Sequence, residues 1–329
     1  MKMFSKLIAL AVLVTGMSFS AFAQDKEAVP AAVPAAVPAP AVPAPAVPAP
    51  AVATEIKGLR VFSCGHSFHP YVPDMLAEFA KSAGIKDHVI AGKSIIGGSK
   101  SIQHWNVKDA DNKAKEALNA GKVDVLTLTP IYLPDDGIEK FAQLGFEKNP
   151  NFRETVQEFW LPFDVYNPIL YDSKYTPKAG EPALMPKPNP VDHNAAKVED
   201  LRKMHEYYFQ TMNEHITALN NKFGKQVIFV VPVGQAVIAL REKIIAGQAP
   251  GLKVQEELFT DQLGHPKVPL QVLVSYCHFA VIYGKSPVGL PVPGIFVKAK
   301  TPNAEELNRL LQELAWDAVT SHPLSGAKK

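Results

Sequence analysis

Apolar residues from about residue 59 onward fall into two alternating patterns. Residues 59–64 form a short apolar run of strand length that ends at Gly65, whereas those of 70–83 recur with a helical period before Gly84. The same criteria predict further strands at 88–91, 123–129 and 226–231, and further helices at 109–120, 195–223, 235–246, 270–283 and 304–320.

Strands that alternate with helices predict a three-layer α/β/α sandwich with a central parallel sheet. In such sheets the ligand crevice lies beyond the carboxyl ends of the strands. The residues that directly follow each strand are therefore the first candidates for chemistry.

Between residues 141 and 194 the periodic pattern weakens, and prolines occur at 150, 162, 168, 177, 182, 186, 188 and 190. This composition predicts a long irregular excursion. Long loops in compact domains are often functional, and disorder is the alternative interpretation.

The first residues have the three parts of an export signal. Lys2 and Lys6 precede the apolar stretch 7–14, and the small-x-small site 21–23 predicts cleavage before Gln24. The apolar stretch is too short for a membrane anchor, so we expect an exported, periplasmic or extracellular protein without membrane insertion.

Residues 28–53 repeat Ala-Val-Pro and Ala-Pro. Proline prevents helix and sheet from propagating, so this segment favours polyproline II and spans roughly 80 Å when extended. It is either a spacer or a disordered tail without a partner. The predicted organisation is a signal peptide (1–23), an Ala/Pro-rich linker (24–53) and one folded domain (54–329).

Composition excludes several classes of partner. The net charge is +2 and no basic run interleaves with aromatic residues, so we expect neither nucleic acid nor anionic membranes as partners. Cys64 and Cys277 form either a disulfide or two buried free thiols. His66 and His69 have no acidic or cysteine neighbour, so we expect no metal site and no cofactor.

The turn after the first predicted strand carries a candidate nucleophile. In Gly65-His66-Ser67, the serine lies on the crevice side at the start of a helix, where it is either a nucleophile or an ordinary helix cap. Downstream, Asp261 and His265 lie on one loop. An imidazole that takes the serine proton, and a carboxylate that orients the imidazole, would supply what a serine nucleophile requires.

With these residues the chain resembles the SGNH, or GDSL-like, hydrolase family over most of residues 59–291. Gly65-His66-Ser67 is similar to the family's G-x-S turn, Gly97 or Gly98 to its second-strand glycine, and the 261–265 loop to its D-x-x-H pair. The resemblance implies a flavodoxin-like fold, Ser67, His265 and Asp261 as catalytic residues, and the Ser67 and Gly98 amides as oxyanion donors.

The chain departs from the family pattern at two places. Asp261 and His265 are spaced D-x-x-x-H, one residue longer than the family's pair. The third predicted strand ends at Thr129 and is followed by Pro130, Ile131 and Tyr132, without the family's oxyanion asparagine. Thr129 or Tyr132 is the candidate replacement donor.

Other polar and aromatic residues have plainer interpretations. We expect His69 to be a crevice wall or substrate contact, His278 a core histidine, and 192–193 an exposed turn. Trp160, Phe163 and Tyr166 form either a sugar-stacking wall or ordinary packing.

Two functions remain open from the sequence. The first is an exported serine hydrolase that cleaves an ester of a small molecule or an acyl group on a carbohydrate. The second is a non-catalytic binding or envelope-associated protein of the same fold with a degenerate site. The sequence indicates no oligomeric state.

Overall fold

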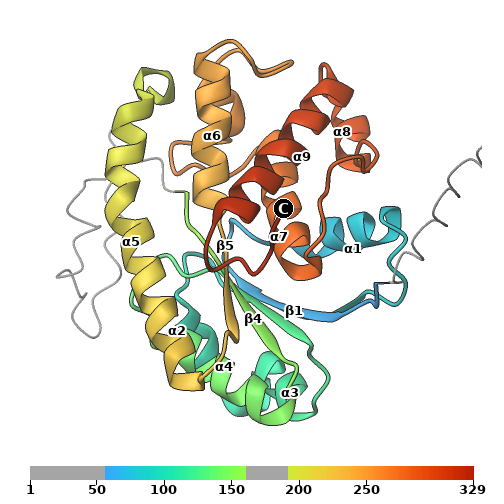
Figure 1. Cartoon of the computed structure of the whole chain (residues 1–329), viewed down its shortest axis with the longest axis vertical. Coiled ribbons are helices and arrows are strands. Elements are labelled where there is room, and N and C mark those ends of the chain that lie inside the picture. Colours follow the sequence, from blue (N-terminus) through green and yellow to red (C-terminus); the bar gives the residue numbers. More distant parts are fainter. Residues whose placement is uncertain (1–55, 161–191) are drawn as a thin grey trace, which may run out of the picture. The chain divides into compact units, whose positions relative to one another are not determined.

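The computed structural model describes residues 56–160 and 192–329 of the chain (Figure 1). The predicted signal peptide and linker, and Phe163 and Tyr166, lie outside these residues.

A five-stranded sheet forms the centre of the described domain. All neighbouring strands pair in parallel, in the order β2-β1-β3-β4-β5. The strands are β1 (Arg60–Gly65), β2 (Val89–Ile95), β3 (Val125–Leu128), β4 (Arg153–Gln157) and β5 (Ile228–Val231). This sheet, flanked by helices, confirms the predicted α/β fold and is consistent with flavodoxin-like and SGNH topology.

Nine α-helices are present in the described residues, in two layers (Figure 1). α1, α6, α7 and α9 pack with one another on one side of the sheet, and α2 and α3 both contact α4 on the other. α5 is joined to α4 by an ion pair between Lys222 and Glu139. The bounds are α1 (Val72–Ser82), α2 (Ser101–Trp105), α3 (Lys113–Asn119), α4 (Asp136–Lys148), α5 (Val198–Phe223), α6 (Val233–Ile245), α7 (Val268–Tyr283), α8 (Gly294–Ala299) and α9 (Ala304–Ser321).

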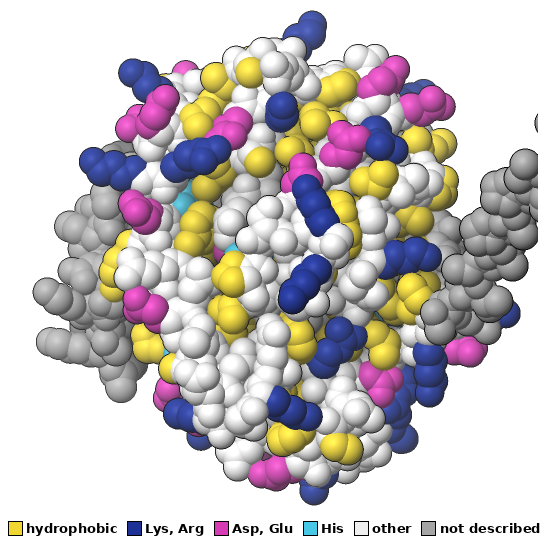
Figure 2. Space-filling view, in the orientation of Figure 1, with side chains coloured by type: hydrophobic (Ala, Val, Ile, Leu, Met, Phe, Trp, Pro, Cys, Tyr) yellow, Lys and Arg dark blue, Asp and Glu magenta, His cyan; other side chains and the backbone are white. Residues whose placement is uncertain are grey.

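α7 is the most deeply buried helix of the layer that contains α1. Every residue from Val272 to Tyr283 is buried, because α7 lies beneath α9 and against α1 and β5. Within the described part of the chain, no helix is both long and apolar enough to cross a membrane. On the face drawn in Figure 2, both basic and acidic side chains are present.

The prediction of an irregular excursion over 141–194 is wrong for its first part. Most of α4 and all of β4 lie in this range, and β4 pairs with β3 on one side and β5 on the other. The sequence of β4 shows no apolar run because it contains Glu154 and Gln157, although both of these polar residues are buried. Residues 161–191, where most of the prolines lie, are outside the described residues.

Parallel pairing brings the carboxyl ends of all five strands to one edge of the sheet. β1 leads into Ser67, β2 into Gly97, β3 into Thr129 and β4 into Trp160. This edge is where the candidate site lies.

Candidate active site

The turn after β1 is held tightly against the end of β3. A Cβ at Gly65 would lie 2.7 Å from Thr129 Oγ1 and 2.8 Å from His69 Cβ, so only glycine fits without displacement. The amide of His66 donates to Thr129 Oγ1 at 3.3 Å. These contacts fix the backbone that presents Ser67, whose side chain is half-buried.

Ser67, His265 and Asp261 form one hydrogen-bonded chain. The Oγ of Ser67 lies 2.8 Å from His265 Nε2, and His265 Nδ1 lies 2.6 Å from Asp261 Oδ2. A carboxylate accepts only, so Nδ1 carries the proton and Nε2 is left as the acceptor for the serine hydroxyl. The three residues have the order of contacts that activates a serine nucleophile.

The loop from Phe259 to Pro266 absorbs the extra residue between the acid and the histidine. Its two ends pair in an antiparallel bridge. Inside, the amide of Gly264 donates to the Asp261 carbonyl at 3.1 Å, and Gly264 has φ of 81°, a left-handed conformation that suits glycine. The longer D-x-x-x-H spacing therefore still brings Asp261 to His265.

Asp261 is held as a carboxylate although it is partly buried. Burial opposes its charge, but hydrogen bonds from the amide and ring of His265 and from the Leu263 amide outweigh it, and the pKa of Asp261 lies below its ordinary value. The side chain of His265 is 30% exposed and that of Asp261 44%, so solvent reaches this end of the chain of contacts.

One aromatic ring, that of Phe68, packs against the imidazole, and two further rings pack against Phe68. Phe68 meets His265 edge to face, with ring centroids 5.0 Å apart, and stacks on Trp160 at 4.7 Å and on Phe159 at 5.0 Å. The Trp160 indole N–H donates to the Gly264 carbonyl at 3.2 Å. Trp160 is buried, so packing is the interpretation that the structure supports, not an open sugar-stacking wall.

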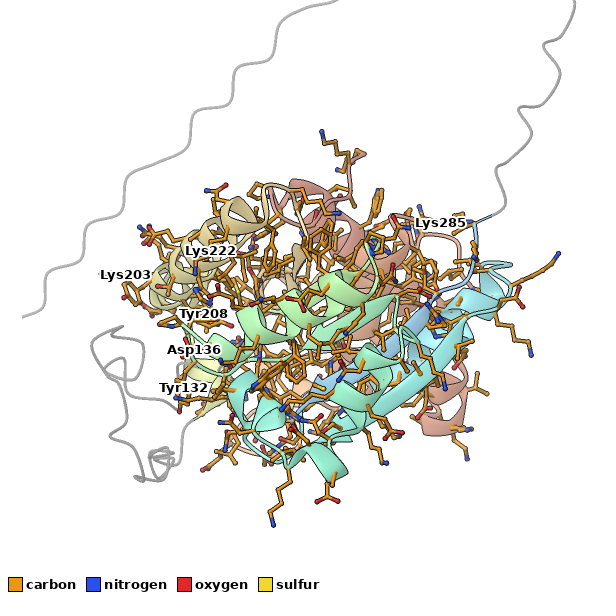
Figure 3. The ribbon with its side chains drawn as sticks, turned by 90° about the horizontal axis from the view of Figure 1, so that it is seen from below. Tyr132, Asp136, Lys203, Tyr208, Lys222 and Lys285 are labelled. Carbon is orange, nitrogen blue, oxygen red and sulfur yellow. The ribbon has the colours of Figure 1, made fainter. Side chains whose placement is uncertain are left out.

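The backbone behind this aromatic group is anchored from α5. The hydroxyl of Tyr208, which Figure 3 labels, accepts the amide of Phe159 at 2.9 Å. Tyr208 is itself buried. The end of β4 is therefore fixed from the side of α5 as well as from the loop that carries His265.

The glycine pair after β2 is positioned by a histidine that the sequence analysis did not single out. The ring of His104 is hydrogen-bonded to Ser94 Oγ at 2.9 Å and to Ser99 Oγ at 2.8 Å, which ties β2 to the residue after Gly98. Burial lowers the pKa of His104 to about 4, so it is neutral here. The sequence indicates this arrangement only through the serines that flank the two glycines and the histidine that follows them.

Two amides at this edge are unused. Among the described residues, no hydrogen bond is made by the backbone N–H of Ser67 or of Gly98. Gly97 and Gly98 are exposed, and nothing would lie within 4 Å of a Cβ on either. Open space beside unpaired amides is what an oxyanion site requires.

Thr129 and Tyr132, the two candidate replacements for an asparagine after β3, lie in different surroundings. Thr129 is buried and its hydroxyl accepts the His66 amide, as described above. Tyr132 is half-buried beneath the ammonium group of Lys100, which lies 5.2 Å from its ring centroid.

His69 is not at the crevice surface. It is fully buried, and its ring nitrogens lie 2.9 Å from Thr127 Oγ1 and 3.0 Å from Gln157 Oε1. His278 lies 2.8 Å from the same oxygen of Gln157, so the two imidazoles share one amide inside the core. This geometry gives no support to the prediction that His69 contacts substrate, whereas the prediction that His278 is a core histidine agrees with its place.

The structure also describes the two cysteines, the 192–193 turn and the surroundings of possible metal ligands. Cys64 and Cys277 are both free and buried. Asp192 is exposed, as expected for a turn, but His193 is buried against the ring of Phe259, with ring centroids 4.8 Å apart. No group of three or more metal-binding side chains is arranged around a common point in the described residues.

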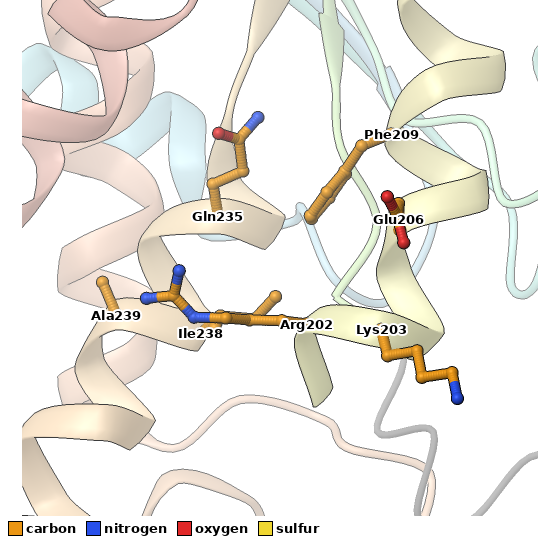
Figure 4. A pocket seen from close by; sticks show the side chains of 7 residues that line it. All are labelled: Arg202, Lys203, Glu206, Phe209, Gln235, Ile238 and Ala239. Atoms are coloured by element: carbon orange, nitrogen blue, oxygen red, sulfur yellow. The ribbon is translucent and has the colours of Figure 1, made fainter. Parts of the chain in front are cut away.

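A separate pocket of about 620 Å³ lies between α5 and α6 (Figure 4). It is lined by Arg202, Lys203, Glu206, Phe209, Gln235, Ile238 and Ala239. Gln235 also donates to the buried carboxylate of Glu158 at 2.9 Å. None of the residues that line this pocket belongs to the Ser67, His265 and Asp261 chain, so size alone does not identify the chemical site.

Comparison of the chain with protein-family models, curated proteins and solved structures gives no significant match. The chemistry of the site is therefore argued from its own geometry.

Proposed function

We propose that this chain is a serine ester hydrolase of the SGNH, or GDSL-like, type. One observation carries the proposal: Ser67 Oγ lies 2.8 Å from His265 Nε2, while His265 Nδ1 lies 2.6 Å from Asp261. The two side chains that would exchange the proton are within direct hydrogen-bond reach.

In the first half of the reaction, Ser67 Oγ attacks the ester carbonyl carbon and His265 Nε2 takes the hydroxyl proton. The imidazolium that forms is stabilised by the carboxylate of Asp261. When the tetrahedral intermediate breaks down, His265 returns the proton to the leaving alkoxide, and an alcohol departs. An acyl group then remains on Ser67.

In the second half, a water molecule attacks the acyl-enzyme while His265 Nε2 takes a proton from the water. Collapse of the second intermediate releases a carboxylic acid, and the proton returns to Ser67 Oγ. In both halves, the unpaired amides of Ser67 and Gly98 are the donors that we assign to the developing oxyanion.

The proposed substrate is an ester of a small molecule or an acyl group on a carbohydrate. The carbohydrate part, and export to the periplasm or the exterior, come from the family resemblance and the N-terminal sequence. No cofactor or nucleic acid is part of the proposal.

Hydrolysis of a short-chain p-nitrophenyl ester by the chain without its first 23 residues tests the proposal. We expect turnover in the unchanged protein and a loss of at least about 10³-fold in Ser67→Ala, because residual catalysis without the nucleophile is small. Ser82→Ala, an exposed serine at the end of α1, is the matched control and should retain full activity.

A second candidate is a non-catalytic binding protein of the same fold. The observation that favours it is the absence of an asparagine after β3, where Thr129 instead accepts the His66 amide. This second function would be supported by a folded protein that hydrolyses no acetyl ester, no butyryl ester and no acylated carbohydrate. Its Ser67 should also fail to react with a fluorophosphonate probe.

A further inference from the structure

In the loop that carries Asp261 and His265, one backbone carbonyl needs a hydrogen-bond donor from outside the loop. Its extra residue is accommodated by the left-handed Gly264, directly before His265. Gly264 is buried, and a buried carbonyl without a donor is costly. The group that pairs with this carbonyl therefore also sets the position of the next residue, His265.

The donor comes from a different element. Trp160, at the end of β4, gives its indole N–H to the Gly264 carbonyl at 3.2 Å. Its ring stacks on Phe68, and Phe68 in turn meets the His265 ring edge to face. One tryptophan therefore reaches the histidine by two routes, through the backbone of Gly264 and through the ring of Phe68.

We infer that Trp160 is a positioning residue of the proposed hydrolase, whose indole N–H fixes the 259–266 loop so that His265 points its Nε2 at Ser67. The inference rests on the proposed function for its kinetic part only. Trp160 touches neither Ser67 nor His265 in the described contacts, so its effect passes through Gly264 and Phe68.

The first test is Trp160→Phe in the chain without its first 23 residues, which keeps an aromatic ring against Phe68 and removes the N–H. We expect kcat for a p-nitrophenyl ester to fall about 10- to 100-fold with KM within about twofold, because a small misplacement of a reacting group costs rate rather than affinity. We also expect the downfield NMR resonance of the proton between His265 and Asp261 to broaden or disappear.

A second variant guards against loss of folding. Replacement of Trp160 by benzothienylalanine keeps the shape of the indole and removes only the N–H, and it should lower kcat to a similar extent. Trp316→Phe is the matched control, since Trp316 packs against the core from α9 and should keep both kcat and the resonance.

Two results would overturn the inference. One is a folded Trp160→Phe protein with the kcat and the downfield resonance of the unchanged protein. The other is a rise in KM alone, which would make Trp160 a substrate contact. If the unchanged protein hydrolyses no ester, the proposed function fails, whereas the resonance still reports whether Trp160 positions His265.

Discussion

Asp261 combines two tasks at the scale of a single residue. One oxygen of its carboxylate accepts the amides of Leu263 and His265, which shape the loop, while the other oxygen faces the His265 ring at 2.6 Å. The carboxylate therefore folds its own loop around the imidazole that it orients. This local arrangement explains how the pair tolerates a spacing longer than the family pattern.

Asp261→Asn is expected to lower kcat for ester hydrolysis by about 10⁴-fold, because an amide at this position can donate to Nδ1 and favour the wrong imidazole tautomer. The oxygen of the new amide can still accept the loop amides, so the thermal midpoint should change little. Steady-state kinetics beside Asp74→Asn, an exposed aspartate of α1, measures the effect. A loss of less than tenfold would contradict the role given to Asp261.

The thiols of Cys64 and Cys277 should be unreactive towards thiol reagents in the folded protein. Burial raises the pKa of Cys64 and of Cys277, so the reactive thiolate is scarce as well as shielded. We expect an aromatic disulfide reagent to react with neither cysteine in the native protein and with both in urea. Rapid reaction of a thiol without denaturant would contradict this.

Single residues also mark what the sequence can predict. Ser67 could be predicted as a candidate because it follows the first strand in a glycine turn, and Asp261 and His265 because they lie together on one loop before a helix. His69 was expected at the crevice surface but is buried, because the sequence around an isolated histidine does not show that Gln157 and Thr127 enclose it. The link from Trp160 to Gly264 joins residues 104 positions apart, and no local pattern announces such a pair.

At the scale of elements, the junction of β1 with α1 depends on the absence of a side chain. The Cβ atom that any other residue would add at Gly65 falls on Thr129 and His69, both buried. The glycine after β2 is different, since a Cβ at Gly97 meets nothing within 4 Å.

Gly65→Ala should destabilise the protein by about 1–3 kcal/mol, because the added methyl group overpacks a filled junction. Gly97→Ala should change the free energy of unfolding by less than about 0.5 kcal/mol, as is usual for open surface positions. Urea unfolding of both variants measures the difference. Equal costs for the two substitutions would contradict the contact argument.

Two of the elements that the sequence pattern missed, β4 and α4, have a common cause. β4 lies between β3 and β5 with both faces covered, yet it carries Glu154 and Gln157 in place of an apolar run. α4 contains two glycines, one of which, Gly137, sits where the α2 backbone approaches closely. Tertiary contacts decide these two elements, whereas the strongly periodic helices α5 and α9 were predicted to within a few residues.

At the scale of the whole molecule, buried histidines make stability depend on pH. Burial lowers the pKa of His66 to about 3, of His69, His104 and His322 to about 4, and that of His278 well below its usual range. The unfolded chain binds protons at these sites near pH 6.5, whereas the folded chain does not. Their contribution to stability is complete above pH 6.5 and is lost as the pH falls towards 4.

Buried acids act in the opposite direction. Burial raises the pKa of Glu158 to about 7, and it raises the pKa values of Glu154 and Asp135. In the folded state each of these groups keeps its proton to a higher pH than in the unfolded chain, so each of them lowers stability as the pH rises above its unfolded pKa. We expect the five histidines to outweigh the three acids, so that stability rises with pH between about 4 and 6.5.

We therefore expect the midpoint of urea unfolding to be lower at pH 5 than at pH 7, corresponding to a loss of several kcal/mol of stability. Intrinsic tryptophan fluorescence provides the signal for both titrations. His322→Gln, which removes one histidine far along the chain from Ser67, should reduce the difference between the two pH values. A midpoint at pH 5 equal to or above that at pH 7 would show that the acids dominate.

The α/β architecture could be predicted because strands and helices alternate along the chain, and the five strands of the sheet repeat this alternation. The right-handed connections of parallel strands then leave few arrangements, and the observed strand order is one of them.

Ser67 and His265 are separated by 198 positions of sequence, yet their side chains lie 2.8 Å apart. In the proposed hydrolase, a growing or truncated chain that stops before residue 265 would contain the nucleophile but not its base. During refolding, ester turnover by the proposed hydrolase would begin only when the loop that carries His265 has docked beside Ser67. The onset of ester turnover would therefore mark the time at which folding is complete.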